Sequence, residues 1–323
     1  MNLESRSKTP PAVVRAPDGL LLVDKPRGVS SHDVVAQVRR ALWTKRVGHT
    51  GTLDPMATGL LVLAVGEGTK LVAHLTEHDK RYACTVQFGV ETESLDADGA
   101  PTNTAPVPTL DRAALEKLCS EFETKTSQVP PMISAIRVDG ERLYKRARRG
   151  EVIDVPPRNV ILRALRLRAV RECEIDLDVH CGKGFYVRAL ARDIAHALGT
   201  VGHLTMLRRT HVADDDVANA VDRAVLDAAS RGDEAARALI RQSMILLPDA
   251  CRRMPSVHLN AIGIDHASHG RAVPLDCVEA TALVPDQVVA LFDDDARPIA
   301  LGKVTEDSIT IMRGFRRDDL VAS

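Results

Sequence analysis

The chain has 323 residues, of which 45% are hydrophobic and 27% charged. That is enough for a large core and for two domains of ordinary size. No apolar run approaches the roughly 18 residues of a membrane helix, and the polar start lacks a signal-peptide pattern, so we expect a cytoplasmic protein. Six cysteines are scattered without any C-x-x-C pair, which argues against a zinc site or a disulfide framework.

The net charge of -1 conceals a concentrated basic segment. Between Arg142 and Arg171 ten basic residues stand against two acidic ones, a local charge of +8 that leaves -9 for the rest of the chain. Such a segment on an otherwise acidic protein is typical of a surface that binds nucleic-acid phosphates. The pattern leaves open the alternative of an arginine-rich surface that is merely solvated.

The N-terminal half begins with a tail and continues with alternating strands and helices. Residues 1–18 are polar and aperiodic, and we expect them to be disordered. The run 19–25 predicts a buried strand, and Ser30-Ser31 offer an N-cap to a helix with one apolar face. Residues 60–66 predict a second buried strand and 69–75 a short helix.

The middle of the chain alternates in the same way. Residues 81–90 have the period of a strand with one buried face, which includes Tyr82. Thr109 is predicted to cap a helix whose apolar face contains Leu115 and Phe122. The basic segment is expected to be an extended, loop-like excursion.

The C-terminal half is predicted to end in a separate domain. Residues 174–181 alternate as a strand, and 187–198 have helical spacing that Gly199 ends, with Arg188 in the first turn. A strand at 204–212 and two helices follow, and the stretch Pro-Asp-Ala at 248–250 is expected to close them. From about residue 256 short strands predict a small β domain.

The segment GHTGTLDPMATG at residues 48–59 is the most informative for chemistry. Its glycines permit close approach to another chain, and His49 and Asp54 project from a loop that Pro55 stiffens. It is not a phosphate-binding loop, because it lacks the G-x-x-x-x-G-K-[ST] spacing. Taken alone, the loop favours an interpretation of Asp54 as an ordinary turn or cap aspartate before a proline.

Five ordered blocks of sequence resolve that ambiguity. They are GLLLVDKPRGVSSHDVV, VGHTGTLDPMATGLLVLAVGEGTK, KRYACTVQFGVETESLDADG, PPMISAIRVDGERLYKRARRGE and CGKGFYVRALARDI, followed by LRR. In this order they are similar to the successive motifs of the TruB family of tRNA pseudouridine synthases. The similarity covers residues 19–210 and weakens after about residue 250.

The resemblance implies an α/β fold with a mixed, largely antiparallel sheet. The catalytic domain would span residues 19–250, with a thumb-like RNA-binding insert at about 128–157, and residues 251–323 would form a β-rich, PUA-like RNA-binding domain. The implied activity is isomerisation of uridine 55 in the T loop of tRNA to pseudouridine. Because nothing is oxidised and nothing leaves, we expect no cofactor and no metal.

The resemblance also assigns roles to residues of the matching motifs. Asp54 would be the catalytic carboxylate, Arg188 would pair with it, and Tyr82 would stack on the flipped-out uracil. Whether Tyr82 also acts as a base stays open, because an ordinary tyrosine pKa near 10 makes it a poor one. The other residues expected to bind the substrate are His49, Tyr186, Leu207, Lys25, Arg146, Arg148 and Arg149.

The expected partner is the T arm of tRNA, bound by a monomer that needs no membrane and no obligate protein partner. A guide-RNA-dependent relative is an alternative, against which stand the absence of a long basic tail and the thumb-like insert. A non-catalytic tRNA-folding or binding protein is another, but such a protein would be expected to lack Asp54, Tyr82 or Arg188. The chemical route taken by Asp54 stays open at this point.

Overall fold

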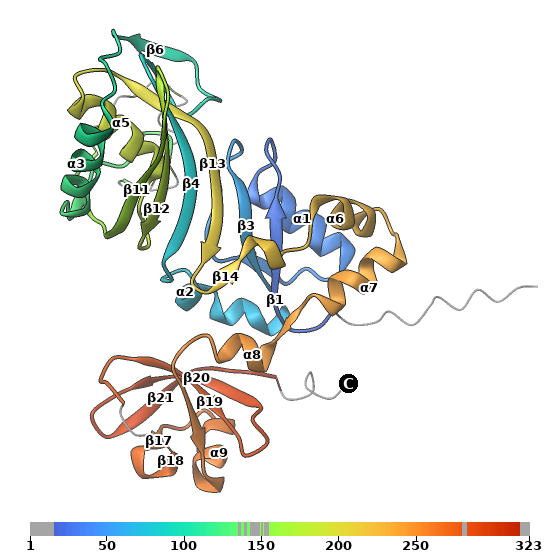
Figure 1. Cartoon of the computed structure of the whole chain (residues 1–323). Coiled ribbons are helices and arrows are strands. Elements are labelled where there is room, and N and C mark those ends of the chain that lie inside the picture. The colour runs from blue at the N-terminus through green and yellow to red at the C-terminus, as the bar shows by residue number, and fades with distance from the viewer. Residues whose placement is uncertain are drawn as a thin grey trace, which may run out of the picture.

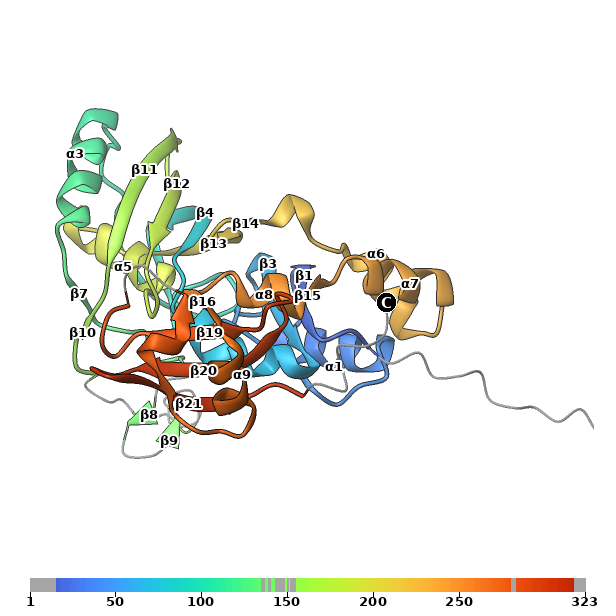
Figure 2. The ribbon, with the colours of Figure 1, turned by 90° about the horizontal axis from the view of Figure 1, so that it is seen from below.

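The computed structural model describes residues 16–134, 137–138, 141–142, 149, 151, 155–279 and 283–316 (Figures 1 and 2). The tail expected at residues 1–18 therefore lies almost entirely outside the described residues. In the described part, no helix is long and apolar enough to cross a membrane.

A nine-stranded sheet forms the centre of the larger part of the molecule, as Figure 1 shows. Its main path runs β11-β12-β4-β13-β3-β1-β15, with β14 beside β13 and β2 beside β3. Among the described strands of this sheet, β13 and β3 pair in parallel and the other pairs are antiparallel, so the sheet is mixed and largely antiparallel, as the resemblance implied. The strands are β1 (Gly19–Lys25), β2 (Val47–His49), β3 (Thr58–Val65), β4 (Lys80–Phe88), β11 (Leu162–Val170), β12 (Glu174–Cys181), β13 (Gly202–Val212), β14 (Asp215–Asp216) and β15 (Ile245–Leu246).

The sheet is buried on both faces around β1 and β3, because these strands are apolar at every position of their centres. In β1, Leu21 and Val23 belong to one hydrophobic cluster, whereas Leu20 and Leu22 belong to another. The first cluster is completed by five helices: α1 (Ser31–Ala41), α3 (Arg112–Glu123), α5 (Val187–Ala197), α6 (Arg223–Ser230) and α7 (Glu234–Gln242). In strands that are buried on both faces, the sequence is a continuous apolar run and does not alternate between apolar and polar residues.

Local signals set most helix ends, with some exceptions. Ser30 caps α1 in a reciprocal capping box, as expected. α3 is capped by Asp111, not by Thr109, because the Asp111 carboxylate accepts from the Ala114 amide at 2.8 Å. The expected helix at 69–75 is a 3₁₀ turn, η1 (Gly66–Leu71), followed by α2 (Val72–Leu75).

The stretch at residues 248–250 also differs from its prediction. It opens a helix, α8 (Leu247–Cys251), with proline in the first turn, instead of closing one. Proline is accepted there because the first amides of a helix have no intrahelical partner. A short 3₁₀ turn, η2 (Val217–Asn219), precedes α6.

A second sheet of six strands follows α8, as predicted from about residue 256. Its order is β17-β21-β20-β19-β16-β18, and α9 (Ala261–Ser268) packs on it. The elements are β16 (Ser256–Leu259), β17 (Val273–Pro274), η3 (Leu275–Cys277), β18 (Val278–Glu279), β19 (Val288–Phe292), β20 (Pro298–Val304) and β21 (Ser308–Gly314).

The six-stranded sheet is docked against the second face of the larger sheet. Phe292, Leu301 and Phe315 share a hydrophobic cluster with Leu20 and Leu60. A polar contact reinforces it, because the fully buried Glu67 carboxylate is hydrogen-bonded by Arg46, Lys70 and the Arg316 amide.

The predicted insert is bounded by a two-stranded ladder that brings its ends together. β7 (Ser127–Gln128) pairs with β10 (Arg158–Asn159) at its base, and β8 (Arg137–Val138) pairs with β9 (Glu141–Arg142) further out (Figure 2). Another small pair, β5 (Val90–Thr92) with β6 (Pro101–Thr104), extends from the end of β4. Arg146 and Arg148, both expected to bind substrate, lie outside the described residues.

Candidate active site

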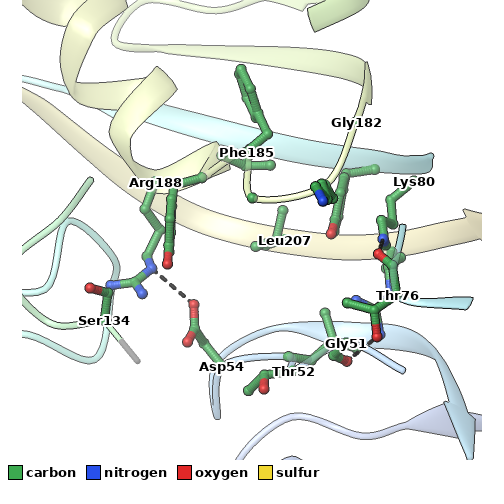
Figure 3. Close-up of a pocket in the computed structure, with 17 residues that line it drawn as sticks. Gly51, Thr52, Asp54, Thr76, Lys80, Ser134, Gly182, Phe185, Arg188 and Leu207 are labelled. Atoms are coloured by element: carbon green, nitrogen blue, oxygen red, sulfur yellow. Dashed lines mark hydrogen bonds and ion pairs between the residues drawn. The ribbon is translucent and has the colours of Figure 1, made fainter. Parts of the chain in front are cut away.

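A cavity of about 260 Å³ opens where β4, β13, the N-terminus of α5 and the connection from β2 to β3 meet. We call that connection, residues 50–57, the Asp54 loop. Figure 3 shows Asp54, Arg188 and Ser134 at one end of the cavity and Lys80, Thr76 and Gly51 at the other, with Leu207 between them. The cavity is therefore built from segments that are far apart in the sequence.

The Asp54 loop is held from the side of α1. The Ser31 hydroxyl accepts from the Leu53 amide at 2.9 Å and donates to the Leu53 carbonyl at 3.0 Å. On the other side of Asp54, the Gly28 amide donates to the Pro55 carbonyl at 2.8 Å. The Asp54 backbone is thus fixed on both sides, which leaves its side chain to face the cavity.

The carboxylate of Asp54 meets the guanidinium of Arg188. Arg188 Nε lies 2.9 Å from Asp54 Oδ2, so the two side chains form a close ion pair. The Arg188 side chain is 4% exposed, whereas that of Asp54 is 37% exposed. Nη1 and Nη2 of Arg188 donate to the carbonyls of Ser94 at 2.6 Å and Ile133 at 3.0 Å. The arginine is therefore immobilised, and it aims an accessible carboxylate into the cavity.

Asp96 is a second carboxylate beside Arg188, and the sequence analysis gave it no role. Its Oδ2 lies 3.6 Å from Arg188 Nε, and its side chain is 6% exposed. The Ser94 hydroxyl donates to it at 2.6 Å and the Asp98 amide at 3.1 Å. Burial raises the pKa of Asp96, while these bonds and the Arg188 charge oppose the rise. The one sequence signal that could have placed Asp96 in the site is its position in the stretch SLDADG of a matched block.

The residues expected to contact the uracil of the target nucleotide lie on the wall of the cavity. Tyr82, Tyr186 and Leu207 all line it. Burial raises the pKa of Tyr82 and of Tyr186 above the ordinary value of tyrosine, which disfavours an anionic phenol at neutral pH. The backbone of Tyr186 is fixed by Gln128, whose side-chain amide both donates to its carbonyl and accepts from its amide, at 3.0 and 2.9 Å.

His49 and Lys25 are placed differently from the other expected residues, because neither lines the cavity. Lys25 is fully buried, and its ammonium donates to the carbonyls of Val29 at 2.8 Å and Pro55 at 3.4 Å. This placement argues against direct contact of Lys25 with a substrate and favours support of the Asp54 loop. Burial lowers the pKa of His49, so its imidazole is neutral at pH 7.

Two cations of the cavity wall were not anticipated. Lys80 and Arg209 are 7% and 2% exposed and line the end remote from Arg188. Burial and the neighbouring Arg209 charge lower the pKa of Lys80 to about 8. The Lys80 ammonium donates to the Thr76 carbonyl at 2.6 Å. Both residues stood in matched motifs, KRY and LRR, but their types alone do not separate a buried cation from an exposed one.

The expected basic surface is smaller than its sequence suggested. Its second half forms β10 and β11, and Arg163, Arg168 and Arg171 are ion-paired there with carboxylates. Those carboxylates belong to Asp79, Asp178, Glu174 and Asp176. Arg149, in the insert, pairs with Glu151 at 2.8 Å. The local charge of +8 is thus partly neutralised by acids that the fold brings alongside.

Among the described residues, no group of three or more His, Cys, Asp or Glu side chains is placed to hold a metal ion. All six cysteines are free thiols, five of them buried.

Comparison with known proteins places the chain in a family. A family model described as TruB family pseudouridylate synthase (N terminal domain) matches residues 39–187. A tRNA pseudouridine synthase B of Burkholderia lata is 41% identical over 287 residues, which cover 89% of this chain and 87% of that protein. One of Psychrobacter cryohalolentis is 44% identical over 238 residues, 72% of this chain and 64% of that protein. The chain thus matches just under two thirds of the length of this second relative.

The fold is also found in solved structures. A chain of a Cbf5-Nop10-Gar1 complex superposes with a TM-score of 0.72 over 97% of this chain and 93% of that one, at 20% identity. A chain of an H/ACA ribonucleoprotein bound to a substrate RNA containing 2'-deoxyuridine gives a TM-score of 0.71 over 93% and 86%, also at 20% identity. These likenesses establish the fold alone.

The mixed sheet and the C-terminal β-barrel-like domain therefore define a protein with the pseudouridine synthase fold, which confirms the expected fold class. The identity of 41% with the Burkholderia lata protein, over 89% of this chain, identifies the family within that fold. The chain belongs to the TruB family of pseudouridine synthases.

Proposed function

We propose that this protein isomerises uridine 55 in the T loop of tRNA to pseudouridine, with Asp54 as the catalytic carboxylate. The observation that carries the proposal is the buried Arg188 guanidinium, which aims the accessible Asp54 carboxylate into the cavity. The family assignment supports the reaction class, and the relatives named tRNA pseudouridine synthase B support the substrate.

The reaction suits the side chains that face the cavity. The N-glycosidic bond breaks, the uracil turns, and a bond from C5 to the ribose replaces the original one, so atoms and electrons balance within the nucleotide. A carboxylate that attacks the nucleotide or removes a proton, and a cavity that retains the detached base, supply what the reaction requires. Asp54 provides the first, and the walls at Tyr82, Tyr186 and Leu207 provide the second.

The target uridine has to leave the stack of the T loop to reach Asp54. Extrusion costs a few kcal/mol, which stacking on Tyr82 and contacts to the RNA backbone would offset. We assign Tyr82 to stacking, because burial raises its pKa and a neutral phenol is a poor base. The insert with Arg146, Arg148 and Arg149, and the six-stranded domain, are the proposed contacts to the T arm.

Guide-RNA-dependent modification is the second candidate, favoured by the superposition on chains from H/ACA complexes. The two candidates differ in what must be added to the reaction. A tRNA enzyme modifies an unmodified transcript unaided, whereas a guide-dependent one requires a second RNA.

The test is incubation of the purified protein with an unmodified tRNA transcript, followed by carbodiimide mapping of pseudouridine. A reverse-transcription stop at the T-loop uridine is expected without added guide RNA. Asp54→Asn should abolish this stop and keep tRNA affinity within about tenfold, roughly 1.4 kcal/mol, because phosphate contacts elsewhere supply most of the binding. Turnover of Asp54→Asn near the wild-type rate would refute the proposal, and a stop seen only with guide RNA would favour the second candidate.

A further inference from the structure

Arg209 lies on the strand that joins the two halves of the site. In β13 it is paired with Gly59 of β3 in the parallel ladder and with Tyr82 of β4 in the antiparallel one. Gly59 is packed tightly there: a Cβ would lie 2.2 Å from the Arg209 carbonyl oxygen, and its φ of +100° favours glycine. The Arg209 backbone therefore sets the end of the Asp54 loop beside the strand that carries Tyr82.

The Arg209 side chain connects the same segments a second time. Its Nε donates to the Leu60 carbonyl at 2.6 Å and its Nη2 to the Gly51 carbonyl at 3.1 Å. Gly51 belongs to the Asp54 loop and Leu60 lies shortly after it, so one guanidinium clamps both ends of the loop. The planar fork of arginine suits such a brace, whereas a lysine ammonium provides only a point charge.

The same guanidinium also acts on Tyr82. Burial raises the pKa of Tyr82, and the charge of Arg209 opposes that rise. Arg209 is 2% exposed, and in the described part of the chain it forms no ion pair with a carboxylate. Its charge is therefore not cancelled by a partner and is felt by the groups of the cavity.

We propose that Arg209 is a positioning residue that fixes the Asp54 loop and the strand segment carrying Tyr82 relative to each other across the cavity. The proposal rests on the proposed pseudouridine synthase activity and adds a residue that the Asp54–Arg188 pair does not include. Arg188 orients the carboxylate at one end of the cavity, whereas Arg209 sets the distance from its loop to the stacking tyrosine. A displacement of about 1 Å between such groups is enough to lower turnover by about 100-fold.

Arg208 is a matched control on the same strand. Its guanidinium binds Asp24 through two hydrogen bonds, at 2.7 and 3.0 Å, and it does not line the cavity. Substituting glutamine at either position removes one positive charge from β13, and only Arg209→Gln removes the brace.

The kinetic test compares these variants with unmodified tRNA as the substrate. For Arg209→Gln we expect kcat to fall by about 100-fold with KM changed by less than about threefold, because positioning is lost and RNA contacts remain. Arg208→Gln should keep both parameters within about threefold of wild type. A rise in KM at unchanged kcat, or equal losses in the two variants, would overturn the proposal. If Arg209→Gln does not fold, the folded Arg209→Lys protein decides, and wild-type kcat in it would overturn the proposal.

A spectroscopic test needs no RNA, and so it separates this inference from the proposed function. The chain has three tyrosines, so labelling their Cζ atoms with ¹³C gives three resonances, and Tyr82→Phe assigns one of them. Arg209→Gln should move the Tyr82 resonance and leave that of Tyr186, whereas Arg208→Gln should move neither. An unmoved Tyr82 resonance in folded Arg209→Gln would show that Arg209 does not set the surroundings of Tyr82 and would overturn the proposal. Absence of pseudouridine formation by the wild type would instead refute the proposed function.

Discussion

Arginine–carboxylate pairs occur in two contrasting places, the cavity and the outer strand β11. At the cavity, Arg188 is 4% exposed and lies 2.9 Å from Asp54 and 3.6 Å from Asp96. On β11, the side chains of Arg163 and Arg168 are 47% and 62% exposed in pairs of the same chemistry. An exposed pair contributes about 0–1 kcal/mol, whereas a buried one fixes a geometry and is costly to break.

The contrast shows that burial, not residue type, decides what an arginine does here. Arg188 has its donors committed to two carboxylates and two carbonyls, so it can hold only one orientation. The β11 arginines sit on the edge strand of the sheet, where charged side chains also discourage pairing with another chain. The proposed catalytic role at the cavity and the protection of the sheet edge therefore use the same two side-chain types.

Of the substitutions that test this contrast between buried and exposed arginines, Arg188→Lys is expected to have the largest effect on turnover. The charge is kept, but the fork that reaches the Ser94 and Ile133 carbonyls is lost, so the Asp54 carboxylate is no longer aimed. We expect kcat to fall by about 100- to 1,000-fold, measured by tritium release from C5-labelled uridine in tRNA. Asp96→Asn, which keeps the hydrogen bonds to Ser94 and Asp98, should cost less, about tenfold. Wild-type turnover in a folded Arg188→Lys protein would show that charge alone suffices.

An intermediate effect is expected for the buried lysine under the Asp54 loop. Burial lowers the pKa of Lys25 from 10.5 to about 8, with the Asp54 charge opposing and the Arg209 charge adding to the shift. Between these two pH values the unfolded chain holds a proton that the folded chain has released. The free energy of unfolding of the wild type should therefore rise with pH relative to Lys25→Met, by about 1–2 kcal/mol across that window.

Urea unfolding at several pH values between about 7 and 10 measures this difference. The exposed Lys117→Met variant is the control, because its ammonium stays in water and the difference from wild type should be flat. If the difference in free energy of unfolding between the wild type and Lys25→Met is also independent of pH, the Lys25 ammonium is not buried in solution.

Local patterns predicted the framework well. Strand β12 coincides with the predicted residues 174–181, because apolar and polar residues alternate there without a break. The Asp54–Arg188 pair followed from the ordered motifs. The cap of α3 was misplaced by two residues, since Thr109 and Asp111 are both good capping residues and propensity does not choose between them.

What the sequence did not predict depends on contacts between distant segments. Arg209 reaches Leu60 across 149 residues, and nothing in either neighbourhood marks that bond. The acids of β12 follow the basic segment directly, but the pairing of Arg168 with Asp178 depends on the register of the hairpin. A sequence window shows the charges, and only the fold shows which ones meet.

The smallest effect is expected from substitutions in the basic segment. They test whether the exposed arginine–carboxylate pairs contribute to stability or to tRNA binding. Two triple variants each remove three positive charges: Arg163, Arg168 and Arg171 to glutamine on β11 and just after it, and Arg146, Arg148 and Arg149 to glutamine in the insert. The arginines of the first group are paired with carboxylates, so an RNA phosphate that displaced those carboxylates would add little binding free energy. Because the pairs are exposed, the free energy of unfolding should change by no more than about 1 kcal/mol. The slope of log affinity for tRNA against log salt should hardly change in that variant. In the insert variant the slope should fall by about 2, since each lost phosphate contact releases about one counterion fewer and Arg149, which is paired with Glu151, should contribute as little as the β11 arginines. Equal slopes in the two variants would show that the β11 arginines exchange their carboxylates for RNA, and the exposed pairs would then belong to the binding surface.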